Sequence, residues 1–380
     1  MTATLLFLAL LPAAPDSDVR LNKQIDDLVQ KLGHRDYKLR EQAARDLLEI
    51  GAPAADAIKA GQQSPDGEIS ERCKKLYPQL WTRGLEKRLL TFAKATGDKD
   101  SEDLPFAKKW LGIVGDTKAG RELYANMVRM HAARLQSIED GRAAMPGVLA
   151  EFAREVYTKN AAATGIRTMT ATGEPDVALY LFLGAMGDDR RTLPAGMSST
   201  HCYQFLNADW LGKTLGGDGP SKETRALYAK WLEKERYSLV MHRAIEVAAV
   251  NKVAECGPAA LKIAADTTTS PLVRATALLG YARLGTKDGL KELEPFFKDA
   301  ATVTTVAFAP GGRMTVQVRD VALGAALLMA GQSPKAFGFE REAPTTATLT
   351  SYTYYAFADD EKRDAAHAKW KEWAAGNLKK

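Results

Sequence analysis

Few residues in this chain are suited to catalysis, and their spacing matches no common catalytic pattern. His201 and Cys202 are the one adjacent pair that combines a potential base with a potential nucleophile. Neighbouring residues point in different directions on most backbones, so adjacency does not predict a catalytic dyad. We expect both residues to lie half-buried in an irregular connection between helices.

The segment Gly212-Lys213-Thr214 has the residues that end a phosphate-binding loop. Such a loop also needs a glycine five positions before Gly212, where this chain has Asn207, and a buried strand leading into it. Residues 202–211 do not have the pattern of such a strand. We therefore predict no nucleotide site here.

The potential metal ligands are scattered along the chain. No two histidines lie four residues apart, and the three cysteines lack the CxxC spacing of zinc sites and disulfide frameworks. We expect no metal, no cofactor and no catalytic residue among them: His34, His131, His201, His242 and His367, with Cys73, Cys202 and Cys256.

Composition indicates a folded protein without a nucleic-acid footprint. The 380 residues include 52 basic and 47 acidic side chains, interleaved, for a net charge of +5. No stripe of Lys and Arg with interleaved aromatic residues is present, so we expect no nucleic-acid partner. The length predicts two or three subdomains or one elongated solenoid.

The N-terminal segment 1–15 contains an apolar run, Thr4 to Leu11, followed by Pro12-Ala13-Ala14. The run has the size of a signal-peptide core and is far shorter than the ~20 residues of a membrane span. No Lys or Arg precedes it, and Pro15 disfavours cleavage after Ala14. We interpret it as a possible signal peptide of an exported, periplasmic or envelope-associated protein that does not span a membrane. A frayed helix in a cytoplasmic protein is the alternative.

A short pattern recurs at long intervals. It consists of a β-branched or leucine residue, an arginine, an alanine three positions later and a final glycine. Its apolar residues have helical spacing, and the glycine stands where a helix would end. Such self-similarity is typical of stacked helical pairs. The copies are Arg40, Ala43 and Gly51, then Arg274, Ala277 and Gly285, and more loosely Arg319, Ala322 and Gly331.

This pattern resembles HEAT repeats, in particular the short repeats of phycobilisome-lyase-type HEAT proteins. Residues 28–76 and 270–299 resemble them most closely, with Cys73 at an alanine position in a second copy, where we expect a small buried thiol. Residues 110–124 and 319–339 are similar to parts of uncharacterised exported bacterial proteins with HEAT-like repeats. The resemblance implies an all-α fold, an α-solenoid of helical pairs, and a structural role for the repeat arginines. An anion-binding ladder is the alternative role.

Outside the repeats, two segments predict extended structure. Thr302 to Phe308 and Met314 to Val318 are rich in Val and Thr and flank Pro310-Gly311-Gly312, which predicts a β-hairpin. The Thr- and Tyr-rich run 345–357 could be extended too and could pack on the hairpin to cap the solenoid. The alternative is an exposed edge that recruits a partner strand.

The whole chain then divides into five predicted parts. They are a possible signal peptide at 1–15, N-terminal HEAT-like repeats at 18–96, a middle helical region at 104–215 with an irregular connection beginning near 187, C-terminal HEAT-like repeats at 222–340 with the hairpin at 302–318, and an extended run with a capping helix at 341–380.

The sequence predicts an architecture better than a function. Stacked helical pairs offer a long surface, which favours a non-catalytic scaffold or protein-interaction module with an unidentified protein partner. One alternative is a lyase or isomerase acting on a bound cofactor or protein-attached chromophore, which would depend on His201 and Cys202. The other is a nucleic-acid-binding solenoid.

Overall fold

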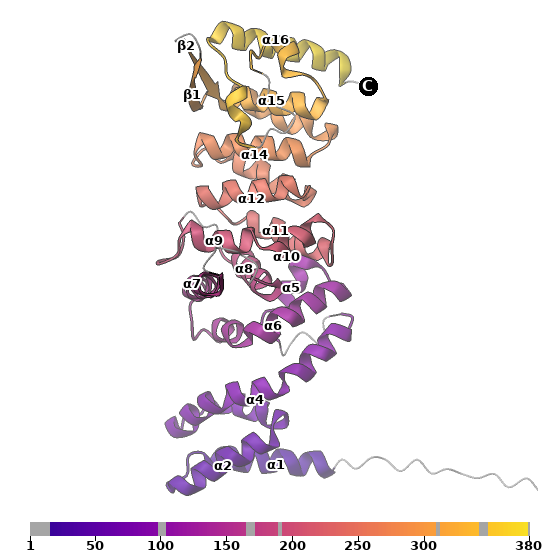
Figure 1. Ribbon diagram of the computed structural model, residues 1–380. Helices are drawn as coiled ribbons and strands as arrows, with labels where there is room; N and C mark the ends of the chain where they lie inside the picture. The colour runs from indigo at the N-terminus through magenta and orange to yellow at the C-terminus, as the bar shows by residue number, and fades with distance from the viewer. Residues whose placement is uncertain are drawn as a thin grey trace, which may run out of the picture. The chain divides into compact units, whose positions relative to one another are not determined.

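The computed structural model describes residues 16–97, 104–164, 172–188, 192–308, 312–341 and 349–378. The possible signal peptide at 1–15 and the tip of the hairpin lie outside these ranges. The described chain is predominantly helical with one small antiparallel sheet, as predicted (Figure 1). Its described residues form two compact units, divided between residues 91 and 92, and helix α4 contains this division.

The first unit is built from helices whose apolar faces share one core. Helix α1 packs against α2 and α3. Asp36 caps α2 by accepting a hydrogen bond from the Lys38 amide at 2.8 Å, and Gly51 ends the helix with a φ of +76°. Ala43, at its repeat position, is buried as its helical spacing requires. The elements are α1 (Asp16–Lys31), α2 (Tyr37–Ile50), η1 (Ala52–Ala54), α3 (Ala55–Gly61) and α4 (Gly67–Lys94).

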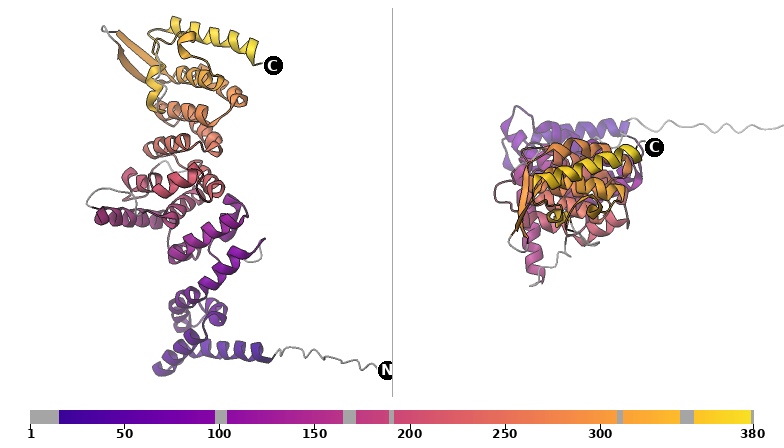
Figure 2. Two further views of the ribbon diagram at one scale, coloured as in Figure 1. Left: turned by 45° about the vertical axis from the view of Figure 1, so that its right-hand side comes forward. Right: turned by 90° about the horizontal axis from the view of Figure 1, so that it is seen from above.

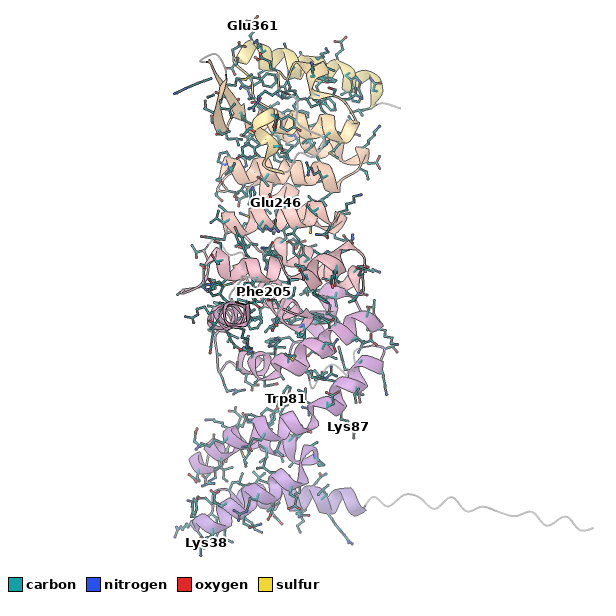
Figure 3. The ribbon with its side chains drawn as sticks, viewed as in Figure 1. Lys38, Trp81, Lys87, Phe205, Glu246 and Glu361 are labelled. Atoms are coloured by element: carbon teal, nitrogen blue, oxygen red, sulfur yellow. The ribbon has the colours of Figure 1, made fainter. Side chains whose placement is uncertain are left out.

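In the second unit, the first helices pack around aromatic side chains. Phe205 stacks on Tyr180 with 4.3 Å between ring centroids, and Phe152 and Trp231 extend this cluster. Figure 3 shows Phe205 inside the unit, whereas Glu361 points away from it. The elements are α5 (Ala107–Val114), α6 (Lys118–Glu139), α7 (Met145–Thr164), α8 (Glu174–Met186), α9 (Ser199–Leu206), α10 (Asp209–Gly216) and α11 (Ser221–Leu232).

The predicted irregular connection after residue 187 is wrong for much of its length, because α9 and α10 lie within it. Each has eight residues, so its apolar positions repeat over only two turns and give a weak periodic signal. Phe205 and Leu211 are nevertheless fully buried. The two helices are separated at Asn207-Ala208, and residues 189–191 lie outside the described part.

The later helices of the second unit lie side by side. Helix α14 packs against α12, α13 and α15, and α15 also packs against η5 (Figures 1 and 2). Because it has neighbours on several sides, α14 is buried at 11 of its 14 residues. The elements are α12 (Ser238–Val250), η4 (Ala254–Cys256), α13 (Gly257–Ala265), α14 (Pro271–Leu284), η5 (Lys287–Lys298), α15 (Val318–Ala330), η6 (Pro334–Phe337), η7 (Leu349–Tyr354) and α16 (Asp360–Asn377).

The predicted hairpin is confirmed. Strands β1 (Thr302–Phe308) and β2 (Gly312–Gln317) pair antiparallel, with Val306 opposite Met314. Met314 and Val316 are buried beneath the sheet, where β2 leads directly into α15.

The predicted extended run at 345–357 is wrong over residues 349–354, which form the 3₁₀ helix η7; residues 342–348 lie outside the described part. Phe357 alone pairs with the sheet, through two hydrogen bonds with Thr315. The Thr and Tyr side chains favour strands by composition. Tertiary packing dominates here instead, because the ring of Tyr355 lies against Gly324 of α15.

This contact yields a prediction. A Cβ at Gly324 would overlap the Tyr355 ring, whereas Gly112 of α5 has open space at its Cβ position. Gly324→Ala should lower the free energy of unfolding by about 1–3 kcal/mol through overpacking. Gly112→Ala should be neutral or stabilising by up to about 1 kcal/mol, because alanine is the better helix former. Urea denaturation of both variants checks this, and equal stabilities would contradict it.

Candidate functional site

The repeat arginine of α14 is buried and bonded on two sides. Arg274 is 4% exposed, and its Nε donates to the carbonyl oxygen of Ala264, in the last turn of α13, at 2.7 Å. Its Nη2 forms an ion pair with Asp299, which follows η5. One guanidinium therefore joins α14 to the elements before and after it.

The other two repeat arginines also bond to protein groups. Arg40 donates to the carbonyl oxygens of His34 and Arg35 at 2.7 and 3.0 Å, and its Nε lies 3.1 Å from a carboxylate oxygen of Glu68 in α4. Arg319 donates to the side chain of Gln317 at 2.6 Å. It also donates to Asp360 of α16 at 3.1 Å.

The remaining repeat positions divide into buried alanines and helix-ending glycines. Ala43, Ala277 and Ala322 are all buried at 0–1% exposure. Gly51 and Gly331 have positive φ values of +76° and +69°, so the repeat there needs glycine. The third glycine, Gly285, has a φ of −87° and does not require this freedom.

Two further arginines have the same geometry, although the repeat pattern in the sequence does not include them. Arg121 is 1% exposed and donates to Asp116, Phe92 and Gly97 at 2.6–3.1 Å. Arg363 is 2% exposed and donates to Asp320 of α15 at 2.7 Å.

A shared sequence signal identifies these residues. Arg40, Arg121, Arg274 and Arg363 each follow a helix N-cap by four positions; the N-caps are Asp36, Thr117, Ser270 and Asp359. We call these four the N4 arginines. A helical side chain leans toward the N-terminus of its helix, so an N4 guanidinium reaches past the start of its helix to groups on other elements. Arg319 is only two residues past its N-cap, Gln317, in agreement with the looser repeat there.

The side chains of His201 and Cys202 both bond to Ser198, the N-cap residue of α9. The Ser198 amide donates to Nδ1 of His201 at 3.0 Å, which forms a capping box, and the thiol of Cys202 donates to the Ser198 carbonyl oxygen at 3.5 Å. Burial, followed by the charge of Arg154, lowers the pKa of His201. The two side chains thus contact the same residue through different groups.

All three cysteines are buried. Burial raises the pKa of Cys73 to about 11, and it raises the pKa of Cys256 further. A thiol with a raised pKa is a poor nucleophile and a poor metal ligand at neutral pH, because both roles need the thiolate. Within the described residues, no group of three or more His, Cys, Asp or Glu side chains could hold a metal ion.

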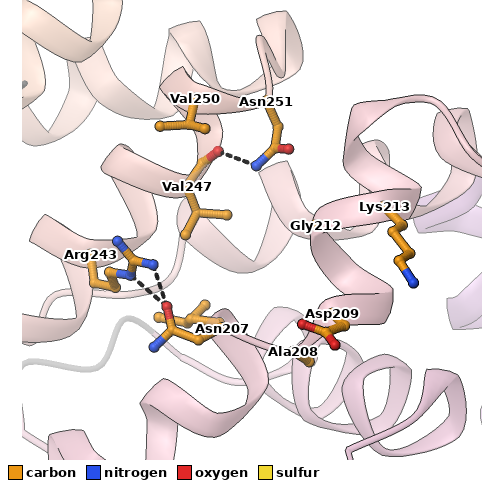
Figure 4. Close-up of a pocket in the computed structure, with 10 residues that line it drawn as sticks. Asn207, Ala208, Asp209, Gly212, Lys213, Arg243, Val247, Val250 and Asn251 are labelled. Atoms are coloured by element: carbon orange, nitrogen blue, oxygen red, sulfur yellow. Dashed lines mark hydrogen bonds between the residues drawn. The ribbon is translucent and has the colours of Figure 1, made fainter. Parts of the chain in front are cut away.

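A cavity of about 320 Å³ lies between the α9–α10 turn and the C-terminal half of α12 (Figure 4). We call it the α10–α12 cavity. Arg243 and Asn207 meet on one side, where Nε of Arg243 donates to Oδ1 of Asn207 at 2.8 Å. Val250 is 77% exposed at the end of α12. The lining is Leu206, Asn207, Ala208, Asp209, Gly212, Lys213, Arg243, Val247, Val250 and Asn251.

This cavity includes part of the segment that resembles a phosphate loop. Gly212 and Lys213 line it, but they lie inside helix α10, where the Gly212 amide donates to the Ala208 carbonyl oxygen at 3.2 Å. The chemistry of the lining is mixed, with carboxylate, ammonium, guanidinium and amide groups beside two valines. Such a lining suits an amphipathic group better than a bare phosphate.

Comparison of the chain with protein-family models, with curated proteins and with solved structures finds no match. Among the helices of the described residues, none has the length and apolar character needed to cross a membrane.

The buried position of Arg274 yields a second prediction. Arg274→Ala should lower the free energy of unfolding by about 1–3 kcal/mol, because Asp299 and the Ala264 carbonyl lose a charge-assisted partner. Arg142→Ala is the control, since Arg142 is exposed. Thermal and urea denaturation measure both effects. A fully stable Arg274→Ala protein that has lost partner binding would instead indicate an anion- or partner-binding arginine.

The buried thiols yield a third prediction. In native buffer near pH 8, Cys73, Cys202 and Cys256 should not react with a thiol reagent such as Ellman's reagent over minutes, and all three should react in denaturant. Burial restricts access, and at Cys73 and Cys256 the raised pKa suppresses the thiolate. Rapid native labelling of Cys202, mapped by mass spectrometry, would contradict this and favour the lyase hypothesis.

Proposed function

We propose that this chain is a HEAT-like α-solenoid that acts as a non-catalytic scaffold and binds another protein. The observation that carries the proposal is the side-by-side packing of α12, α14 and α15. Each of these helices also packs against a neighbouring element: η4, α13 and η5, respectively. Stacked helical pairs of this kind give a large, repetitive surface that suits protein recognition.

The N4 arginines support the assignment to a repeat architecture. Arg40 in the first unit and Arg274 in the second each donate to carbonyl oxygens at or just after the end of the preceding helix, and each contacts a carboxylate about 25 to 28 residues later in the chain. The same local device therefore recurs in residues far apart in the sequence. This recurrence is expected of repeated structural units, and an unrelated pair of helices would not need it.

The use of the reactive side chains supports a role without catalysis. His201 and Cys202 bond to Ser198 at the start of α9, and Cys256 is buried with a raised pKa. A catalytic nucleophile needs an accessible thiolate and a base within hydrogen-bonding reach.

The α10–α12 cavity is the anchor point that we propose for the protein partner. Protein interfaces concentrate binding energy where a partner side chain enters a pocket that is surrounded by weaker contacts. Val250, exposed beside this cavity, gives it an apolar rim, and Asp209, Lys213 and Asn251 give it polar groups. Because we propose that the protein is exported, we expect its partner in extract of the cell envelope.

The fourth prediction tests this anchor. Val250→Asp should weaken partner binding by about 2 kcal/mol or ~30-fold, the loss typical of an interface hot spot. Leu328→Asp is the matched control, because Leu328 is an exposed leucine of α15 outside the cavity. Both variants should melt like the wild type.

The measurement combines cross-linked affinity purification from envelope extract with quantitative mass spectrometry. A partner that is enriched by the wild type and by Leu328→Asp, but lost with Val250→Asp, supports the proposal. Equal loss in both variants would contradict the anchor. A chromophore absorbance band that persists in the purified protein would favour the lyase hypothesis over the scaffold.

A further inference from the structure

The two-stranded sheet of the second unit has one open edge. Strand β2 lies between β1 and Phe357, because Thr315 donates to the Phe357 carbonyl at 2.9 Å and accepts from the Phe357 amide at 3.1 Å. Within the described residues no strand pairs with the opposite side of β1. The edge of β1 that faces away from β2 is therefore unpaired in this part of the chain.

The register identifies the groups on this open edge. Thr315 uses both backbone groups to bond Phe357, and it lies opposite Thr305 of β1. In an antiparallel pair, residues whose backbone groups point outward lie opposite each other, and they alternate with residues that bond across the pair. The N–H and C=O of Thr305 thus point to the open edge, as do those of Ala307. Both residues are exposed.

From Thr304 to Phe308, strand β1 lacks the usual protection of an open edge. Its sequence, Thr-Val-Thr-Thr-Val-Ala-Phe, has no charge and no proline. The one irregularity of register lies at its start, between Thr302 and Thr304. Exposed strand edges without lysine, proline or a bulge pair readily with other strands. Val306 is also only half-buried, whereas Met314 opposite it is buried.

We propose that the open edge of β1 pairs with β1 of a second copy of this chain, antiparallel and about a two-fold axis at Thr305. In this register Thr305 lies opposite itself, Thr304 opposite Val306, and Val303 opposite Ala307. The outward N–H and C=O groups of Thr305 then bond their symmetry mates. Cross-strand Thr–Thr and β-branched pairs are favourable, and no like charges oppose each other across the axis.

This pairing closes at two copies. The resulting sheet has the order β2–β1–β1–β2, and on each outer side Phe357 already bonds Thr315. A two-fold interface uses the same surface on both copies and leaves no β1 edge for a third. The dimer is independent of the proposed partner-binding cavity, so Val250→Asp should leave it intact.

The test is the molar mass in solution, measured by light scattering and analytical ultracentrifugation over a concentration series. The wild type should dimerise. Thr305→Pro should be monomeric with an unchanged circular dichroism spectrum, because proline is tolerated on an edge strand where the lost N–H faces solvent. Thr305→Val, which keeps both backbone groups, should still dimerise. A wild type that is monomeric at every concentration overturns the proposal, as does a dimeric Thr305→Pro.

Disulfide cross-linking tests the register without relying on the proline variant. Directly opposed residues of a hydrogen-bonded antiparallel pair have Cα atoms ~5.5 Å apart, within the range that a disulfide can bridge. Thr305→Cys should give a covalent dimer under mild oxidation. Arg313→Cys, exposed on β2, should not, because two β1 strands separate it from its copy. Equal cross-linking of the two variants would overturn the two-fold register.

Discussion

The structure depends on how its helices are attached to other parts of the chain, and the four N4 guanidinium groups provide part of that attachment. Those of Arg121, Arg274 and Arg363 are buried. A helix leaves carbonyl groups without partners in its last turn, and a buried carbonyl without a hydrogen bond is costly. Arg274 supplies donors to Ala264 at such an end, and Arg121 supplies them to Phe92. A lysine in place of one of these arginines would provide the charge. Its ammonium group would not hold several donors in fixed directions, as a guanidinium group does.

The N-cap and the arginine act together in these helix starts. Ser270 stands at the N-cap of α14, and Asp359 accepts the Lys362 amide at 2.8 Å to begin α16. Where the helix begins determines where its fourth residue lies, so the cap also fixes the point that the guanidinium can reach. This coupling explains why Arg363 meets Asp320 in the interior and leaves neither charge without a counterion.

The sequence supported the helical class, the hairpin and the buried alanines, because each depends on local periodicity or turn residues. It misplaced the region after residue 187, since α9 and α10 are too short to repeat a pattern. It also misjudged residues 349–354, where the packing of Tyr355 on Gly324 outweighs a composition that favours strands. The α10–α12 cavity could not be predicted, because Asn207 and Val250 come together only through the packing of α12 near α9.

The burial of α14 on nearly every side has a consequence for synthesis on the ribosome. When Leu284 has emerged, α12 and α13 can already cover part of this helix, but its contacts with α15 must wait until Ala330 has followed. At ~5–20 residues per second, this interval lasts about 2 to 10 seconds. During that time a face rich in alanine and leucine is open to water and to other nascent chains. Helix α14 is therefore open to wrong contacts during synthesis, until α15 covers it.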